Sequence, residues 1–316
     1  MKMNRTNQVK VHCAGLMLLS LIFPGLAEQS SRPAQVFAVP EMEQRDPGPG
    51  HRVRVTAPEY QGTDVHHALY LPPDWKPGRT YPVIVEYSGN FFPAGGGSGE
   101  VADSSLGYGL SAGRFIWVVL PFINKDRTKN EVQWWGDEAA TVEYCITTVH
   151  RICREWGGDP GRVFICGFSR GAIAVNYFGL YNDEVAALWR GLITHDHYDG
   201  VKEWNTPWGK PLDVYREKAL ERLKRIAGRP ALVMQGESTK QTRDYLSGKE
   251  RWADFAFIDA RISKVFPELP YGLITHWHTD RWLLYDHATA RKARSWVFDL
   301  AGMNLGETDV RNRIDD

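Results

Sequence analysis

A serine between two glycines is the first feature of the chain that could do chemistry. Ser169 stands in the run Gly167-Phe168-Ser169-Arg170-Gly171, after an apolar segment at 162–166 and before a helical pattern that starts at Ala172. Glycines on both sides let a serine occupy a tight turn between a strand and a helix. The first amides of such a helix favour negative charge beside the serine. The pattern predicts a nucleophile at Ser169, and a strand–helix turn without catalysis is the alternative.

A serine hydroxyl is a weak nucleophile until a base takes its proton. Three histidines near the C-terminus are candidates for that base. His276 ends a predicted strand at 273–276, His278 begins the loop that follows, and His287 precedes the last predicted helix. A histidine at the surface or in the core needs no functional explanation, so the residue types alone leave all three open.

Together with Asp159-Pro160-Gly161-Arg162-Val163 just before it, the serine run resembles the nucleophile elbow of the α/β-hydrolase superfamily. The likeness is greatest to the secreted esterase and prolyl-oligopeptidase-like branches, and it covers about residues 52–300. It implies an α/β fold with a mostly parallel central sheet, helices on both faces and a short inserted lid. It also implies a Ser–His–acid triad with the histidine last in the chain, which favours His278 over His276 and His287, and activity without a cofactor.

The acid of such a triad is the open position. The superfamily most often has an aspartate shortly after the strand that corresponds to 231–234, but this chain has Thr239 there. Glu237 is the nearest carboxylate and can orient an imidazole as an aspartate does, so it is our first choice. Asp196, which follows the predicted strand at 192–194, and Asp244 are the alternatives.

The oxyanion of a tetrahedral intermediate needs two backbone amide donors. One is expected from Arg170, directly after the serine. The other is expected from the loop after the strand at 81–87, where relatives often carry His-Gly-Gly and this chain has Ser88-Gly89-Asn90. We expect Gly89 to let the backbone approach the substrate and Asn90 to supply the amide.

Aromatic residues suggest how a substrate could be held. The chain has 12 tryptophans, and flat rings can stack on the faces of sugars. An insertion at 197–211, where the superfamily often builds a lid, contains Tyr198, Trp204 and Trp208, and Trp135 precedes a long predicted helix. We expect these four side chains to contact substrate, and packing in the core is the alternative for each of them.

The composition of the chain gives no support to a nucleic-acid site or to a metal site built from cysteines. Basic and acidic residues number 38 each, which gives no sign of nucleic-acid binding. The four cysteines form no CxxC motif, so no metal knuckle is predicted. Cys13 lies in the N-terminal segment 1–27, and the other three cannot all pair with one another, so no disulfide framework is predicted. One group of residue types could bind a metal, although we predict none: His195, Asp196, His197 and Asp199.

Hydrophobic patterns outline the remaining architecture. Apolar segments without alternation at 81–87 and 115–120 predict strands that are buried on both faces. Such strands alternate with helical patterns, which predicts a parallel sheet covered by helices. The helical patterns lie at 137–156, 170–180, 217–226, 249–264 and 288–300.

The N-terminal segment has the pattern of a secretory signal. Residues 1–27 combine a basic start, an apolar run at 11–23 and small residues at the cleavage position, and the run is too short and interrupted to span a bilayer. An uncleaved anchor is the alternative. We therefore expect a signal peptide at 1–27, a linker at 28–50, a hydrolase domain at 51–303 and a polar tail at 304–316, in a secreted or periplasmic protein.

These inferences lead to one preferred function. We expect an exported serine hydrolase that cleaves carboxylic esters, with a small-molecule or saccharide ester as substrate and an acyl-enzyme as intermediate. A prolyl-oligopeptidase-type peptidase and a catalytically impaired binding protein on the same fold are the alternatives. We expect no nucleic-acid partner and no stable membrane insertion after signal cleavage, and the oligomeric state stays open.

Overall fold

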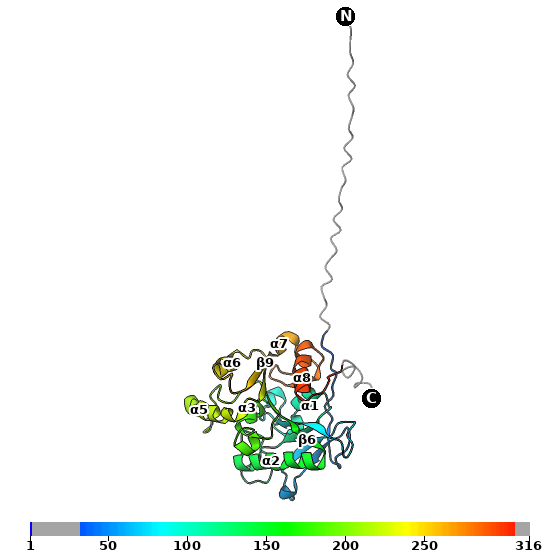
Figure 1. The fold of residues 1–316 in the computed structure, drawn as a ribbon, viewed down its shortest axis with the longest axis vertical. Coiled ribbons are helices and arrows are strands. Elements are labelled where there is room, and N and C mark those ends of the chain that lie inside the picture. The colour runs from blue at the N-terminus through cyan, green and yellow to red at the C-terminus, as the bar shows by residue number, and fades with distance from the viewer. Residues whose placement is uncertain (2–31, 307–316) are drawn as a thin grey trace. The chain divides into compact units, whose positions relative to one another are not determined.

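A nine-stranded sheet is the centre of the chain in the computed structural model (Figure 1). The structure describes Met1 and residues 32–306, and residues 33–306 belong to one compact unit. The strand order is β1-β2-β3-β5-β4-β6-β7-β8-β9; β3 is antiparallel to both neighbours, and all other neighbouring strands are parallel. The prediction of a mostly parallel sheet is confirmed. The strands are β1 (Met42–Glu43), β2 (Arg52–Val55), β3 (His67–Tyr70), β4 (Tyr81–Tyr87), β5 (Ile116–Leu120), β6 (Gly158–Phe168), β7 (Gly191–His195), β8 (Pro230–Gln235) and β9 (Asp254–Asp259).

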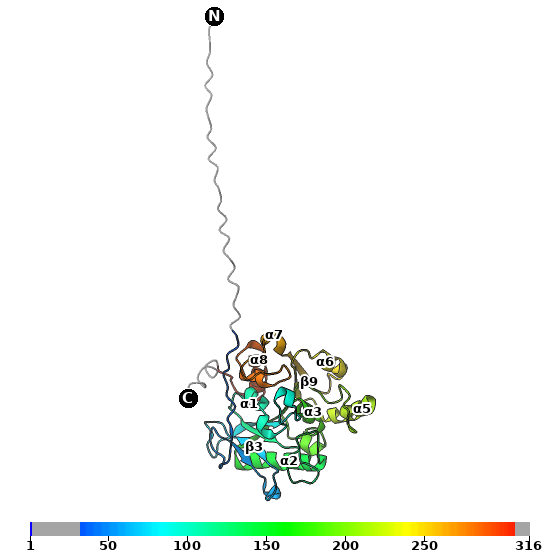
Figure 2. The same cartoon turned by 180° about the vertical axis from the view of Figure 1, so that it is seen from behind.

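The central strands are buried on both faces because alternate side chains enter two different cores. In β4, Val83 and Val85 join the core that contains α2 and α3, whereas Ile84 joins the core that contains α1 and α8. Figures 1 and 2 accordingly show α2 and α8 on opposite sides of the sheet. The helices are α1 (Leu106–Ser111), α2 (Glu138–Glu155), α3 (Arg170–Tyr177), α4 (Asp183–Ala186), α5 (Leu212–Leu223), α6 (Lys240–Leu246), α7 (Ile262–Val265) and α8 (Ala288–Leu300).

The edge of the sheet that follows β8 differs from the sequence prediction. The segment 249–264 was expected to be mostly helical, but it contains β9 and the short helix α7. In β9, Phe255 and Phe257 pack against one core while Ile258 is buried in the other, which is the period-two pattern of a strand. The strand expected at 273–276 is also absent: these residues form turns closed by a bridge between Tyr271 and Ile274.

The segment 33–50 packs on the domain, so the expected linker is wrong for these residues. Phe37 is 1% exposed, and the amides of Val36 and Phe37 both donate to the Leu284 carbonyl, at 2.9 and 3.2 Å. Farther along, β1 adds a parallel strand beside β2. Val36 and Phe37 anchor this otherwise polar segment. Two neighbouring apolar residues show no periodicity, so the sequence analysis did not detect this packing.

The expected signal peptide lies in residues 2–31, outside the described residues, and so do residues 307–316 of the expected tail. Among the helices of the described residues, none is both long and apolar enough to cross a membrane.

Replacing Phe37 by alanine tests whether the N-terminal segment belongs to the core. Its ring is buried against the second core, and the Arg294 guanidinium lies 4.7 Å from the ring centroid. We expect Phe37→Ala to lower the free energy of unfolding by about 3–5 kcal/mol, the usual loss for a buried phenylalanine. Phe91→Ala is the control, since Phe91 is 51% exposed and its loss should change stability by less than about 0.5 kcal/mol. Denaturant unfolding curves that move equally little for both variants would contradict the assignment.

Candidate active site

Ser169 lies in a strained turn between β6 and α3. Its backbone has φ 56° and ψ −117°, a conformation that non-glycine residues adopt at an energetic cost. The flanking glycines are required by close backbone packing: a Cβ on Gly167 would lie 2.1 Å from the Gly171 carbonyl oxygen, and one on Gly171 would lie 1.8 Å from the Tyr87 carbonyl oxygen. The G-x-S-x-G pattern therefore reflects steric constraints that expose the serine at the carboxyl end of the sheet.

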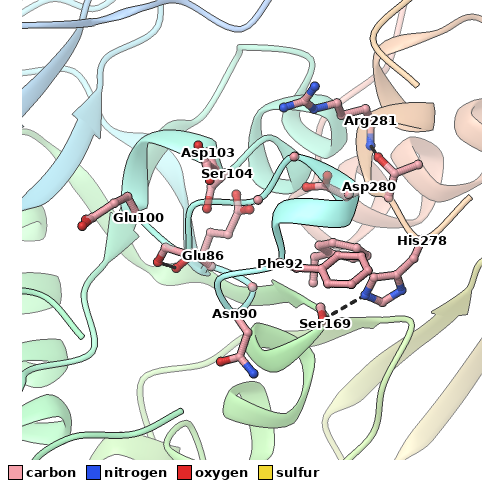
Figure 3. Close-up of a pocket in the computed structure, with 18 residues that line it drawn as sticks. Glu86, Asn90, Phe92, Glu100, Asp103, Ser104, Ser169, His278, Asp280 and Arg281 are labelled. Atoms are coloured by element: carbon pink, nitrogen blue, oxygen red, sulfur yellow. Dashed lines mark hydrogen bonds between the residues drawn. The ribbon is translucent and has the colours of Figure 1, made fainter. Parts of the chain in front are cut away.

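Ser169 and His278, far apart in the sequence, meet at this turn (Figure 3). The distance from Ser169 Oγ to His278 Nε2 is 3.0 Å, and His278 Nδ1 lies 2.8 Å from Asp196 Oδ2. A carboxylate can only accept, so the proton sits on Nδ1 and Nε2 is left to accept from the serine hydroxyl. The geometry suits an imidazole that takes the proton of Ser169 while its charge is balanced by Asp196.

Asp196 follows β7 directly and is held by several donors. Its backbone has φ 75°, and its Oδ1 accepts from the Gly236 amide at 2.5 Å and lies 3.4 Å from His195 Nδ1. Burial acts to raise the pKa of Asp196, but nearby His195, the hydrogen bond from His278 and the Gly236 amide outweigh it and lower the pKa to about 2. Asp196 is therefore an ionised carboxylate at neutral pH.

His195 lies on the far side of Asp196, and the sequence analysis considered it only as a possible metal ligand. It is fully buried, and the Trp282 indole donates to its Nε2 at 2.6 Å. The same Nε2 lies 3.1 Å from the Thr279 carbonyl oxygen, and the ring's Nδ1 lies 3.4 Å from Asp196 Oδ1. The buried imidazole therefore forms the wall behind the carboxylate.

The structure does not bring Glu237 to His278, which corrects our first choice of acid. The Glu237 carboxylate is exposed and accepts from the Ser263 amide at 2.9 Å. Asp244 lies on α6 and pairs with Lys240 at 2.6 Å. Thr239, where the usual aspartate was sought, donates to Asp259 Oδ1 at 2.7 Å, so this loop is tied to β9 instead.

The other two candidate histidines have different contacts. His276 Nδ1 accepts from the backbone amide of His278 at 2.9 Å, so it supports the loop that carries His278. His287 donates from Nε2 to the Trp282 carbonyl at 3.2 Å, and burial lowers its pKa to about 4. Neither ring is hydrogen-bonded to Ser169.

The Gly89–Asn90 peptide lies beside Ser169 in an orientation fixed by the Arg170 side chain. The Gly89 carbonyl accepts from the Arg170 guanidinium at 2.9 Å. In a trans peptide the following N–H points the opposite way, so the Asn90 amide is turned away from the guanidinium. Neither the Asn90 nor the Arg170 amide has a hydrogen-bond acceptor within residues 32–306. Two backbone donors are therefore free at the turn.

The Arg170 guanidinium is a feature that the sequence reading missed, since only its amide was considered. It is fully buried, lies 3.9 Å from the centre of the Phe122 ring and donates to the Trp134 carbonyl at 2.9 Å. Burial lowers the pKa of Arg170 to about 9, which leaves it charged at neutral pH. One cation thus ties the loop after β4 to the segment before α2.

The four aromatic residues expected to contact substrate are buried in, or pack against, one hydrophobic core. Trp135 and Tyr198 are each 3% exposed, and Trp204 and Trp208 each lie 5.1 Å from the ring centroid of Trp134. None of the four lines the pocket beside Ser169. The two tryptophans of the insertion at 197–211 therefore pack on the segment before α2, in line with the core-packing alternative.

Three of the four residues considered for a metal site contact different partners. Asp199 pairs with Arg222 at 2.9 Å, Asp196 binds His278, and His197 packs on Trp204. Within the part of the chain that the structure describes, no group of three His, Cys, Asp or Glu side chains is arranged to hold a metal ion.

A pocket opens directly beside Ser169 and His278 (Figure 3). It has a volume of about 600 Å³, counting its open mouth. Its wall is formed by the loop after β4, the segment 99–104 and the segment 278–281. Four carboxylic acids belong to that wall: Glu86, Glu100, Asp103 and Asp280.

The sheet order, the helices on both faces and the strand–serine–helix turn define the α/β-hydrolase fold. Solved structures share it. An esterase from Rhizomucor miehei matches with a TM-score of 0.51 at 14% identity, over 80% of this chain and 83% of that one. The AtxE2 isopeptidase matches with a TM-score of 0.50 at 12% identity, over 82% of this chain and 41% of that one. A thermostable esterase matches with a TM-score of 0.44 at 15% identity, over 78% of this chain and 62% of that one.

The likenesses to the Rhizomucor miehei esterase and to the AtxE2 isopeptidase support the fold. The chain spans well under two thirds of the isopeptidase. In sequence, neither a family model nor a curated protein matches it.

Substituting Gly171 tests the steric account of the turn. A methyl group there would meet the Tyr87 carbonyl, so Gly171→Ala should push β4 and α3 apart and cost about 1–3 kcal/mol of stability. Gly48→Ala is the matched control, because its Cβ would meet nothing closer than 3.7 Å. Melting temperatures that fall for Gly48→Ala as much as for Gly171→Ala would show that the turn has no special demand for glycine.

Proposed function

We propose that the chain is an exported serine hydrolase that cleaves carboxylic esters of small molecules through an acyl-enzyme. The observation that carries the proposal is the hydrogen-bonded row Ser169–His278–Asp196 beside two free backbone amides. In this fold, such a row at the carboxyl end of the sheet is the arrangement of a Ser–His–acid triad.

In the proposed reaction, Ser169 Oγ attacks the ester carbonyl while its proton passes to His278 Nε2. The tetrahedral intermediate then collapses, and His278 returns that proton to the departing alcohol. Water attacks the acyl-enzyme in the same way, with His278 as base, and releases the carboxylic acid and the free serine. Asp196 stays ionised throughout and stabilises the imidazolium, consistent with its low pKa.

The oxyanion is assigned to the amides of Arg170 and Asn90. Arg170 begins α3, where backbone amides lack partners within the helix. The Asn90 amide is turned toward the free side of its peptide because the Arg170 guanidinium holds the Gly89 carbonyl. Preorganised donors of this kind stabilise charge that develops in the transition state.

The impaired-enzyme alternative rested on the missing aspartate after β8. The contact between Asp196 Oδ2 and His278 Nδ1 supports a complete triad and counts against that alternative. A peptidase would use the same row of residues, so the substrate decides between the two. Comparison of chromogenic acetyl esters with peptide anilides therefore tests the proposed choice of esters.

Export rests on the pattern of residues 1–27. Expression in a secreting host, with the N-terminus of the mature protein determined by sequencing, tests it. An N-terminus near residue 28 would support a cleaved signal, and an intact N-terminus in the cell fraction would contradict it.

The acid is tested by two carboxylate-to-amide changes. Asp196→Asn should lower kcat for ester hydrolysis by about 10²–10⁴-fold, because His278 loses the anion that fixes its tautomer and stabilises its charge. Glu237→Gln is the matched control and should leave kcat unchanged. Ser169→Ala should abolish both turnover and labelling by a fluorophosphonate probe. Equal losses for the two amide variants, or labelling of Ser169→Ala at the parent's rate, would refute the assignments.

The Arg170 guanidinium is tested as a positioning group for the Gly89–Asn90 peptide. Arg170→Met should lower kcat by up to about 10²-fold with a smaller change in KM, since one oxyanion donor loses its orientation. Arg294→Met is the control: Arg294 is also buried and donates to the Gly109 carbonyl at 3.0 Å, but it does not line the pocket beside Ser169. Below the melting temperatures of both variants, a kcat loss of the same size in Arg294→Met would show that only stability is affected.

A further inference from the structure

The insertion at 197–211 lies outside the pocket, yet it contacts the proposed triad. None of its residues lines the pocket beside Ser169. Its first residue, His197, follows Asp196 directly and packs against His278, with the two ring centroids 5.4 Å apart and the ring planes at 32°. The insertion therefore reaches the proposed catalytic groups through one imidazole rather than through a surface that covers substrate.

The His197 ring is hydrogen-bonded to the backbone of Asp196. Its Nδ1 lies 2.8 Å from the Asp196 carbonyl oxygen. A carbonyl can only accept, so Nδ1 carries the ring proton and donates it to this bond. The Asp196 amide in turn donates to the Met234 carbonyl at 3.0 Å, and its carboxylate accepts from the Gly236 amide. His197 thus supplies the partner of the remaining backbone group of Asp196.

This bond matters because the Asp196 backbone is left-handed, with φ 75°. Residues with a side chain adopt this region at an energetic cost and stay there where the surrounding contacts determine it. The bond to Met234 fixes the direction of the Asp196 amide, and the bond from His197 fixes that of the carbonyl. Together they hold the backbone from which Oδ2 reaches His278 Nδ1 at 2.8 Å.

The His197 ring carries no charge at neutral pH. Burial, with the charges of Lys202 and His278, lowers the pKa of His197 to about 3, although Asp196 acts in the opposite direction. A charged ring would oppose the imidazolium that forms at His278 during the proposed reaction, whereas a neutral ring packs beside it without that repulsion. Two imidazoles are therefore in contact, and only His278 is available to take a proton.

The insertion holds His197 through Trp204. The Trp204 ring centroid lies 4.9 Å from that of His197 and 5.1 Å from that of Trp134. The Trp204 amide donates to the Gly209 carbonyl at 3.0 Å, which closes the turn that carries the indole. The Lys202 ammonium lies 4.3 Å from the centre of the same indole. The imidazole therefore packs against a ring that is itself held by several contacts.

We propose that His197 is a positioning residue for the triad, and that the insertion at 197–211 serves to hold His197 rather than to cover substrate. The inference rests on the proposed function and deepens it by adding a residue that acts through Asp196. His197 donates to the Asp196 carbonyl, Asp196 keeps its left-handed backbone, and Oδ2 stays directed at His278.

Two substitutions of His197 separate the hydrogen bond from the ring. His197→Phe keeps a ring but loses the donor, so kcat for ester hydrolysis should fall by about tenfold with KM nearly unchanged. The side-chain amide nitrogen of His197→Asn can take the place of Nδ1, so this variant should keep kcat within about threefold of the parent. Equal values of kcat in His197→Phe and the parent, or a larger loss in His197→Asn than in His197→Phe, would overturn the proposal.

His66→Phe is the matched control for these variants. His66 is also half-buried, and its Nδ1 makes the same kind of bond, to the Asp64 carbonyl at 2.7 Å, but it does not line the pocket beside Ser169. Its kcat should equal that of the parent. A loss in His66→Phe as large as that in His197→Phe, measured below both melting temperatures, would show that only stability is affected.

Trp204→Ala distinguishes a support for His197 from a lid. Loss of the indole should lower kcat by the same factor for nitrophenyl acetate and for nitrophenyl benzoate and leave both KM values unchanged, because the effect passes through His197. A rise in KM confined to the larger ester would show that Trp204 contacts substrate and would overturn this role of the insertion. An unchanged kcat would overturn it as well.

Proton NMR of the free protein gives a readout that does not need turnover. The proton that His278 Nδ1 donates to Asp196 should give a resonance far downfield in the parent and in His197→Asn. In His197→Phe it should move toward the amide region or broaden, because Oδ2 is no longer held in place. An identical resonance in His197→Phe and the parent would contradict the positioning role. Absence of ester hydrolysis by the parent would instead contradict the proposed function, and the NMR comparison would still test His197.

Discussion

A buried carboxylate at the end of β7 is the interaction on which the proposed chemistry depends. Asp196 is almost wholly enclosed, and a lone anion there would be costly. It is stabilised because the Gly236 amide, His278 and His195 converge on it from β8, from the loop before α8 and from β7 itself. The parallel register of β7 and β8 places the two strand ends side by side, so the sheet itself builds the anion site. Formation of this site and orientation of His278 are therefore one structural event.

The second constraint is the steric contact between the turn at Ser169 and the end of β4. The contact of Gly171 with the Tyr87 carbonyl sets how closely α3 approaches β4, and this places Ser169 within reach of His278. The Arg170 guanidinium extends from the same turn and holds the loop after β4. Burial of this cation is tolerated because carbonyl oxygens and the Phe122 ring surround it. One short segment, 167–171, therefore contains the proposed nucleophile, one of the two amides assigned to the oxyanion and the side chain that supports the other.

The sequence was informative where a signal is local. The strand, glycines and helix around Ser169 are contiguous, and the apolar runs of β4 and β5 indicated a sheet buried on both faces. The structure also brings His278 to Ser169, although the strand expected before it is a set of turns. Glu237 failed as the acid because proximity to a strand in sequence does not say where a side chain points. The partner of His278 is set by the pairing of β7 with β8 and by the left-handed backbone at Asp196, which no local pattern reveals.

The sequence did not separate tryptophans of the core from tryptophans that bind a ligand, because the same ring suits either role. In the structure, the ring centroids of Trp135 and Trp208 lie 4.9 Å apart. The acids that line the pocket were not selected from the sequence, because Asp280 lies far along the chain from Glu86 and Glu100.

The most direct test of the central claim is the proton between His278 and Asp196. In the proton NMR spectrum of the free protein, a hydrogen bond from Nδ1 to a buried carboxylate gives a resonance far downfield of the amide region. Our account predicts such a resonance in the parent and in Glu237→Gln, and its loss in Asp196→Asn and His278→Ala. A downfield resonance that survives in Asp196→Asn but disappears in Glu237→Gln would contradict it.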